Sequence, residues 1–271
     1  MKIKAFQLKL NIFMLLFISV LLLVNCEKED IYENEDTPES SITELQEKRL
    51  DSVLKAIPDK MISNLSGYYK ANDGGHYYIR HIGNNVYWFG EHPTGNWANI
   101  FKGELVGNKI TGYFYDLPKG RVAGKGVLKL SILYNGVVLT KDSGNNFGGS
   151  LWVKTIKPAN LPGIRPAGFG VRNDINNITG RWIGDDGGYY YIRQIGNRVV
   201  WFGERNFVSG QPTWSNVAYG SRFYSQLWLD WVDVPKGSIN SSGILRGSID
   251  SANYITKVHS TGGFGGLSWR R

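Results

Sequence analysis

The sequence predicts an all-β protein made of two tandem antiparallel up-and-down β-barrels of about eight strands each, preceded by a short helix. Three observations support this fold class. The chain contains an internal repeat, turn signals follow one another closely, and no segment of either copy has a convincing helical period. Each copy spans about 90 residues, which is enough for a small independent core.

The repeat is clearest where each copy begins. Residues 64–91 and 177–204 are identical at 17 of 28 positions without a gap. After a four-residue insertion in the second copy, the match continues through Trp97 and Trp214 and ends near Phe147 and Phe264. A duplication follows from this pattern. We therefore expect a first barrel over 61–156, a linker rich in proline and glycine over 157–176, and a second barrel over 177–271.

Within the first copy, apolar and aromatic runs alternate with short turn sequences. Asp-Gly and Asn-Gly pairs favour tight hairpins because both residues of each pair tolerate positive φ. A meander of this kind removes its exposed edges by closing into a barrel. The strands are predicted over 65–72, 75–82, 85–92, 97–106, 109–117, 124–134, 137–142 and 150–154.

The N-terminus has the pattern of a lipoprotein signal. A basic start with three lysines precedes a nearly unbroken apolar run over 12–24, which is too short for a comfortable membrane span. The run ends in Leu-Leu-Val-Asn-Cys at 22–26, which resembles a lipobox. The sequence therefore predicts a signal peptide over 1–25 and lipidation at Cys26. Because Cys26 is the only cysteine, no intrachain disulfide can form.

An acidic tether is predicted over 26–60. Residues 27–60 hold 11 acids and 5 bases, a net charge of −6, whereas residues 61–271 have a net charge of +11. The acids at 27–30 resemble the signal that sends lipoproteins of the Bacteroidota to the outer face of the outer membrane, or they only solvate the tether. A capping box at 41–44 begins a short amphipathic helix that Pro58 ends. We expect outer-membrane lipid anchoring, with exposure at the cell surface as one alternative.

The second copy opens with Thr179-Gly180-Arg181-Trp182, which is similar to the Gly-x-Trp start of calycin barrels, the group of lipocalins and avidins. The first copy keeps an aromatic residue, Tyr69, at the tryptophan position. The resemblance implies up-and-down barrels in which an arginine packs across the tryptophan. The serine, tyrosine and asparagine set of a biotin site is not recognisable.

Charged and aromatic residues that recur in both copies are the candidate ligand contacts. The arginines lie in mid-strand, the glutamates end the third strand, and the aspartates precede a shared Pro-Lys-Gly. Such a set could stack on a ligand and bind it at the barrel mouth. Alternatively, Arg–Glu or Arg–Asp pairs only close the barrel end and the aromatic residues fill the interior. The candidates are Tyr78, Arg80, Trp88, Glu91, Trp97 and Asp116, with Tyr191, Arg193, Trp201, Glu204, Trp214 and Asp233.

Catalysis has little support in the sequence. No histidine recurs between the copies, and neither a Cys/His metal-ligand spacing nor a nucleophile elbow is present. We therefore assign no catalytic residue, metal ligand or cofactor, and expect non-catalytic binding of a small molecule or glycan. The basic, aromatic-rich barrels could bind an anionic partner, and outside a bacterial cell we expect a glycan or a lipid head group rather than nucleic acid. Alternatively, the scattered basic residues, in which no run exceeds two, only keep the barrels soluble. Two alternatives stay open: a structural protein that docks a protein partner in the envelope, and a glycan hydrolase using Glu91 and Asp116.

Overall fold

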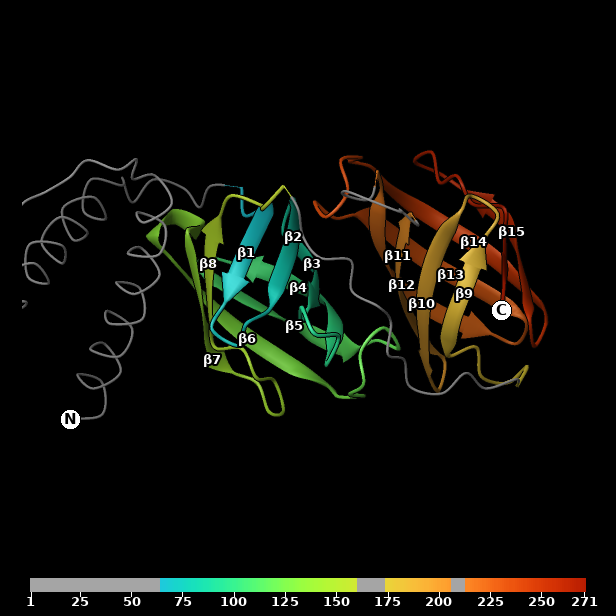
Figure 1. Cartoon of the computed structure of the whole chain (residues 1–271), viewed down its shortest axis with the longest axis horizontal. Helices are drawn as coiled ribbons and strands as arrows, with labels where there is room; N and C mark the ends of the chain where they lie inside the picture. Colours follow the sequence, from blue (N-terminus) through green and yellow to red (C-terminus); the bar gives the residue numbers. More distant parts are fainter. Residues whose placement is uncertain (1–63, 160–173, 206–212) are drawn as a thin grey trace, which may run out of the picture. The chain divides into compact units, whose positions relative to one another are not determined.

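The computed structural model describes residues 64–159, 174–205 and 213–271. Within them the chain forms two closed antiparallel barrels of eight strands each, and the strands follow the sequence order around each barrel (Figure 1). The predicted fold class is therefore confirmed for these residues. The expected signal peptide, tether and short helix lie outside the described residues, as does most of the expected linker.

The first barrel closes where β8 pairs with β1. Its strands begin and end within two residues of the predicted positions, and the pairs Asp73-Gly74 and Asn135-Gly136 lie in two of the turns between them. The 3-10 turn η2 (Tyr134–Gly136) contains Asn135 at a φ of 54°. The strands are β1 (Gly67–Ala71), β2 (His76–Ile82), β3 (Asn85–Glu91), β4 (Ala98–Val106), β5 (Lys109–Asp116), β6 (Lys125–Leu133), β7 (Val138–Ser143) and β8 (Leu151–Thr155).

The second barrel repeats this meander and closes where β16 pairs with β9. Gly187 has a φ of 77° and Gly74 a φ of 81°, so both copies use a glycine in the left-handed region for the first turn. The strands are β9 (Gly180–Gly184), β10 (Gly188–Ile195), β11 (Arg198–Arg205), β12 (Ser215–Phe223), β13 (Gln226–Asp233), β14 (Ser242–Ser251), β15 (Tyr254–Ser260) and β16 (Ser268–Arg270).

Large aromatic side chains fill both barrels. Tyr77 and Trp88 belong to the interior core of the first barrel, and Tyr190 and Trp201 belong to that of the second. Successive strand residues point to opposite faces, so the neighbours of these residues point outward. The inward and outward alternation that the paired aromatic residues predict is thus confirmed.

The Gly-x-Trp position lies inside the barrel in both copies. The indole nitrogen of Trp182 donates to the carbonyl oxygen of Ile178 at 2.9 Å, and the Tyr69 hydroxyl donates to that of Leu65 at 3.0 Å. The guanidinium of Arg271 lies 4.6 Å from the centre of a Trp182 ring. The arginine that covers the tryptophan of the second barrel is therefore Arg271.

The outward-facing aromatic residues form a third core where the two barrels meet. Tyr78, Phe89, Tyr191 and Phe202 are all buried in this cluster. The rings of Phe89 and Phe202 are stacked with centroids 3.5 Å apart and an angle of 3° between their planes. Because these are equivalent positions of the two copies, the contact has an approximate two-fold character.

Candidate ligand-binding pockets

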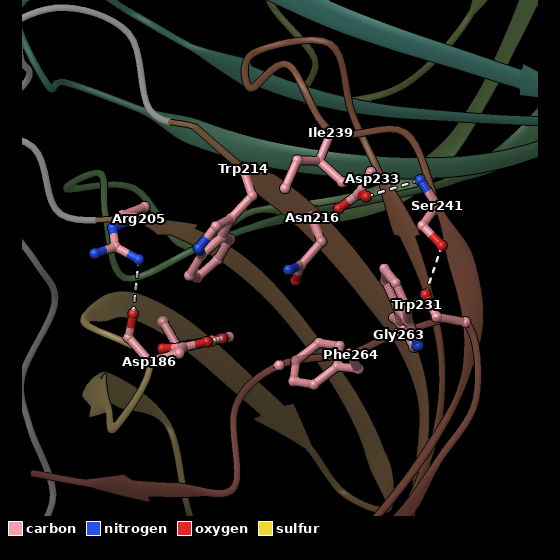
Figure 2. A pocket seen from close by; sticks show the side chains of 13 residues that line it. Asp186, Arg205, Trp214, Asn216, Trp231, Asp233, Ile239, Ser241, Gly263 and Phe264 are labelled. Carbon is pink, nitrogen blue, oxygen red and sulfur yellow. Dashed lines mark hydrogen bonds between the residues drawn. The ribbon is translucent and has the colours of Figure 1, made fainter.

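A cavity of about 310 Å³ opens at one end of the second barrel (Figure 2). This volume falls at the lower end of the range typical of small-molecule sites. Its walls combine aromatic rings with a few polar groups. The lining residues are Asp186, Tyr190, Arg205, Trp214, Asn216, Trp231, Asp233, Ile239, Ser241, Gly262, Gly263, Phe264 and Gly265.

Two glycines make room for the aromatic wall. A Cβ atom at Gly188 would lie 2.3 Å from the Trp214 ring, and one at Gly203 would lie 2.6 Å from the Tyr190 ring. Both distances are too short for real contacts, so glycine at these positions allows the rings to lie against the sheet. Glycines within the strands therefore shape the pocket, whereas other glycines form the turns.

Three polar groups are held in fixed orientations around the cavity. The Tyr190 hydroxyl donates to Oδ2 of Asp186 at 2.6 Å, and the backbone nitrogen of Gly188 donates to Oδ1 at 3.0 Å. The indole nitrogen of Trp201 donates to Oδ1 of Asn216 at 3.1 Å. Because an indole N–H can only donate, this bond fixes which end of the Asn216 amide carries the NH₂ group. That NH₂ group is a donor available to a ligand.

Asp233 has an unusual environment for a carboxylate. Its Oδ2 accepts a hydrogen bond from the backbone nitrogen of Ser241 at 2.8 Å, while its other oxygen lies on the pocket side (Figure 2). Burial raises the pKa of Asp233 to about 6, against the opposing effects of the Ser241 bond and the charge of Arg80. A partly desolvated carboxyl in a concave site is a typical ligand-binding group.

The first barrel has a pocket at the equivalent place, but its volume is only about 110 Å³. The same residue types line both pockets at matched positions, which are Asp73, Tyr77, Trp97, Asn99, Asp116 and Phe147 in the first copy. The hydrogen bonds are also repeated, since Tyr77 donates to Asp73 at 2.7 Å and Trp88 donates to Asn99 at 2.9 Å. Burial likewise raises the pKa of Asp116 to about 6.

The loop before the shared phenylalanine distinguishes the two pockets. Counted back from Phe147 and Phe264, the first copy has Asn146 where the second has Gly263. Asn146 lines the smaller pocket with a φ of 64°, and Gly263 has a φ of 79°. A Cβ atom at Gly263 would meet no atom within 4 Å, so the space that a side chain would occupy is open.

The pockets contain four of the twelve ligand contacts that the sequence predicts. Trp97 and Asp116 line the first pocket, and Trp214 and Asp233 line the second. Trp88 and Trp201 are buried in the barrel interiors, where each holds the pocket asparagine. The structure brings the other six residues to the contact between the barrels.

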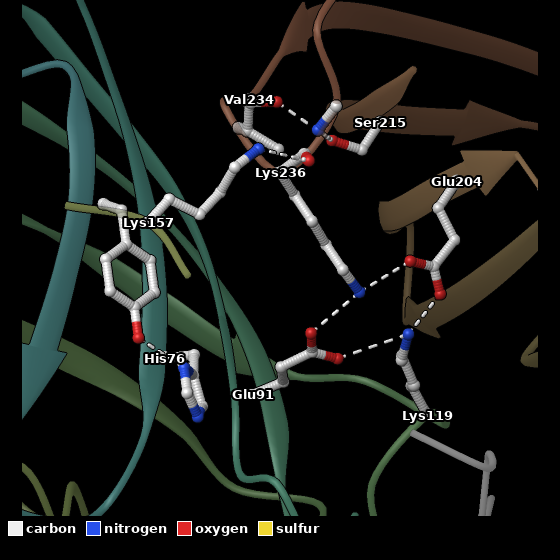
Figure 3. A network of polar contacts seen from close by, with 10 residues as sticks. His76, Glu91, Lys119, Lys157, Glu204, Ser215, Val234 and Lys236 are labelled. Atoms are coloured by element: carbon white, nitrogen blue, oxygen red, sulfur yellow. Dashed lines mark hydrogen bonds and ion pairs between the residues drawn. The ribbon is translucent and has the colours of Figure 1, made fainter. Parts of the chain in front are cut away.

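Glu91 and Glu204 form a closed ring of charges with Lys119 and Lys236 (Figure 3). Lys236 lies 2.7 Å from Glu91 and 2.6 Å from Glu204, and Lys119 contacts both glutamates as well. All four residues are buried. Burial alone would raise the pKa of Glu204, but the two ammonium groups outweigh this effect and hold it well below its ordinary value. The glutamates thus pair with lysines rather than with the expected arginines.

The arginines and tyrosines are also contact residues of the barrels. Arg193 donates to the backbone oxygens of Asp116, Ala123 and Gly124 of the first barrel at 2.6–2.7 Å. Tyr78 and Tyr191 are buried in the third core. Arg80 is partly buried, and its charge acts on Asp233 of the second barrel. These side chains hold the two barrels together instead of lining a barrel mouth.

Four of the six matched pairs of pocket residues are absent from the sequence-based candidates, and one of them is the phenylalanine pair Phe147 and Phe264. Asp73 and Asp186 have the pattern of turn residues, and Asn99 and Asn216 stand out only as matching positions. Tyr77 and Tyr190 cannot be distinguished by sequence from their outward neighbours. The only sequence signal for these residues is that the same residue recurs at the same place in both copies. This recurrence does not distinguish a residue that forms a turn from a residue that lines a binding site.

Within the part of the chain that the structure describes, no group of three or more His, Cys, Asp or Glu side chains could hold a metal ion. The same residues contain no helix whose length and apolar character would suffice to cross a membrane. Comparison with models of protein families finds no match to the chain, and comparison with curated proteins finds none.

Proposed function

We propose that the chain is a non-catalytic lipoprotein of the outer membrane whose calycin-like barrels bind a small molecule or glycan, with the second barrel as the main site. The observation that carries this proposal is the duplicated pocket. The same aspartates, tyrosine, tryptophan, asparagine and phenylalanine surround a hollow at the same end of both barrels. The cover of Arg271 over Trp182 supports the calycin-like assignment.

The pocket chemistry favours a ligand with hydroxyl groups and an apolar face, such as one sugar residue. Asp233 offers an acceptor, the Asn216 amide and Arg205 offer donors, and Trp214 offers an aromatic surface. A ring bearing hydroxyl groups can use acceptors and donors together and can pack its C–H face on an indole. The volume of about 310 Å³ suits a ligand of this size.

A protein partner in the envelope is the second candidate. The interior of the first barrel is nearly filled by Tyr77, Trp88 and Trp152, which suits a structural role for that copy. The hydrolase alternative gains no support from the site. Glu91 is bound to two lysines between the barrels, so it does not join Asp116 in a pocket.

The experiment is a binding screen on residues 27–271, which contain the whole compact unit Lys60–Arg271. A panel of monosaccharides and disaccharides is tested by thermal shift and then by calorimetry. A ligand that binds the native state raises the Tm by mass action. We expect this rise to disappear in Trp214→Ala and in Asp233→Asn.

The first barrel provides the matched controls. Trp97→Ala and Asp116→Asn make the same chemical changes in the smaller pocket, and we expect both to leave the Tm rise in place. An equal loss in all four variants would mean that the ligand binds elsewhere or that the variants misfold. Absence of any Tm rise across the panel would move the weight to a protein partner, which crosslinking in the envelope would then identify.

A further inference from the structure

The hairpin that joins β12 to β13 differs from its counterpart in a way that the fold does not require. Phe223, Tyr224 and Trp228 occupy the positions of Val106, Gly107 and Thr111 in the first copy. We call these three aromatic residues the aromatic tip. Their exposed fractions are 53%, 96% and 50% respectively, so none of them contributes a full side chain to a core.

Tyr224 is held in a backbone conformation that disfavours it. Its φ of 53° lies in the left-handed region, where Gly107 of the first copy has a φ of 59°. A Cβ atom at Gly107 would meet nothing within 4 Å, so this place in the hairpin offers a side chain no packing. An exposed aromatic residue that adds backbone strain and makes no core contact points to a role outside the barrel.

A row of basic side chains crosses the sheet beside the aromatic tip. In the second barrel, the five aligned positions on β11 to β15 carry two arginines, a serine, a tryptophan and a histidine, whereas those of the first barrel carry one acid and one base and have no net charge. The row in the second barrel is Arg198, Ser221, Trp228, Arg246 and His259. Its counterpart is Asn85, Glu104, Thr111, Lys129 and Ser143.

Local contacts fix the orientation of this surface. The guanidinium of Arg246 lies 4.8 Å from the centre of the Trp228 ring, and its Nη1 donates to two backbone carbonyls at 3.1 Å. The Phe223 ring meets Trp228 edge to face at 6.1 Å. Asp230 follows on the same strand face, but its charge acts on Tyr87 of the first barrel and so lies toward the contact between the barrels.

We propose that the aromatic tip, with Arg198 and Arg246, docks on a lipid surface that carries anionic headgroups. Tyrosine and tryptophan favour the membrane–water interface because one end of each side chain is apolar and the other is polar. Arginines beside them attract anionic headgroups. A single projecting hairpin suits insertion into an interface better than it suits a protein surface, which would need a larger complementary patch.

The test measures co-sedimentation of residues 27–271 with vesicles. One vesicle type is pure phosphatidylcholine, and the other is phosphatidylcholine with phosphatidylglycerol. We expect binding only to the anionic vesicles, weakening as salt is added. The variant Phe223→Val, Tyr224→Gly and Trp228→Thr takes its three residues from the first barrel, and we expect it to bind about tenfold or more weakly.

Two further variants separate the contributions. Arg198→Asn with Arg246→Gln keeps the aromatic tip, and we expect it to lose the preference for anionic vesicles. Tyr113→Ser removes another exposed aromatic residue from the first barrel without changing the charge, and this variant should bind like the parent. Circular dichroism and Tm confirm that each variant is folded.

Three results would overturn the proposal. The parent could fail to bind anionic vesicles, or the variant of the aromatic tip could bind as well as the parent. The parent could also bind immobilised dextran sulfate without binding vesicles, which would identify a soluble polyanion as the partner. None of these results depends on the pockets, so failure here leaves the proposed ligand binding unaffected.

Discussion

The two barrels share their strand order, most of their interior aromatic residues and several polar groups of their pockets, and two of the differences between them lie in exposed loops. One difference is Asn146 against Gly263 beside the pocket, and the other is Gly107 against Tyr224 at the hairpin tip. Both lie in loops, where a change does not disturb a closed sheet. The comparison indicates that the copies share one framework, on which the second has a larger pocket and an aromatic tip.

The feature that both copies build together is the ring of four charges. We predict that Glu204→Gln lowers the free energy of unfolding by about 3–5 kcal/mol, because two buried ammonium groups then share the single carboxylate of Glu91 and one buried positive charge is left uncompensated. Glu91→Gln should have a similar effect if the contact is symmetric. Urea denaturation measures both changes.

The exposed pair of Lys109 and Asp142 is the control for this prediction. These ions are 2.9 Å apart, but both side chains are accessible to solvent. Asp142→Asn should therefore change the free energy of unfolding by less than about 1 kcal/mol. Equal effects of Asp142→Asn and Glu204→Gln would show that the ring does not hold the barrels together.

The ring also has a predicted pH dependence. The pKa of Glu204 is lowered, so its stabilising contribution is present above the unfolded-state pKa and is lost as the pH falls through the folded value. The pKa of Lys119 is raised, so its contribution is lost only as the pH rises above its ordinary range. The ring is consequently most effective between these limits.

The strands and turns are predictable because each depends on a local pattern. Short turn sequences with glycine and asparagine or aspartate mark many of the hairpins, and alternation tells which strand residues share a face. Alternation does not say what covers the outer face of a barrel. The sequence therefore predicts Glu91 and Arg193 at a barrel mouth, although the other barrel covers them, and it gives no sign that Lys119 in the shared Pro-Lys-Gly is buried.

An exchange at the pocket loop tests whether one residue accounts for the difference in pocket size. We predict that Gly263→Asn weakens ligand binding to the second barrel by about tenfold or more, because the side chain enters open space at the pocket wall. Asparagine tolerates the φ of 79° found there, so the fold should be kept. Calorimetry with the ligand from the screen measures the change.

The reverse substitution completes the exchange. Asn146→Gly removes a side chain that lines the smaller pocket, and we expect measurable binding in the first barrel when Trp214→Ala disables the second. Unchanged affinity in Gly263→Asn would show that the loop is not responsible. Two other differences, Phe114 against Trp231 and Val122 against Ile239, would then be tested next.

The pocket aspartates provide a comparison in which both barrels should behave alike. Burial raises the pKa of Asp116 and of Asp233 to about 6, above the ordinary value of 3.8. The folded state therefore binds more protons than the unfolded state between about pH 4 and pH 6, and stability falls as the pH rises through this window. An asparagine side chain does not titrate, so Asp116→Asn and Asp233→Asn each remove one carboxyl's share of this loss.

We predict that the free energy of unfolding of Asp233→Asn, taken relative to that of the parent, rises by about 1 kcal/mol from pH 4 to pH 7 after allowance for solvent screening. Urea denaturation at each pH measures this difference. Asp116→Asn should gain a similar amount. A gain in only one of the two variants would show that the pockets differ in electrostatics as well as in size. A constant difference across this pH range would mean that neither carboxyl is desolvated.

The smallest expected effect concerns the hairpin tip. We predict that Tyr224→Gly raises the free energy of unfolding by about 0.5–1 kcal/mol, because glycine adopts a φ of 53° without the steric cost of a Cβ atom. The greater freedom of glycine in the unfolded chain reduces this gain without reversing it. Gly107→Tyr in the first barrel should lower the free energy of unfolding by a similar amount, and thermal denaturation measures both.

A stabilising Tyr224→Gly that also weakens vesicle binding would show that the second barrel keeps its tyrosine for a surface contact. A destabilising Tyr224→Gly would instead assign the side chain a role in holding the hairpin together.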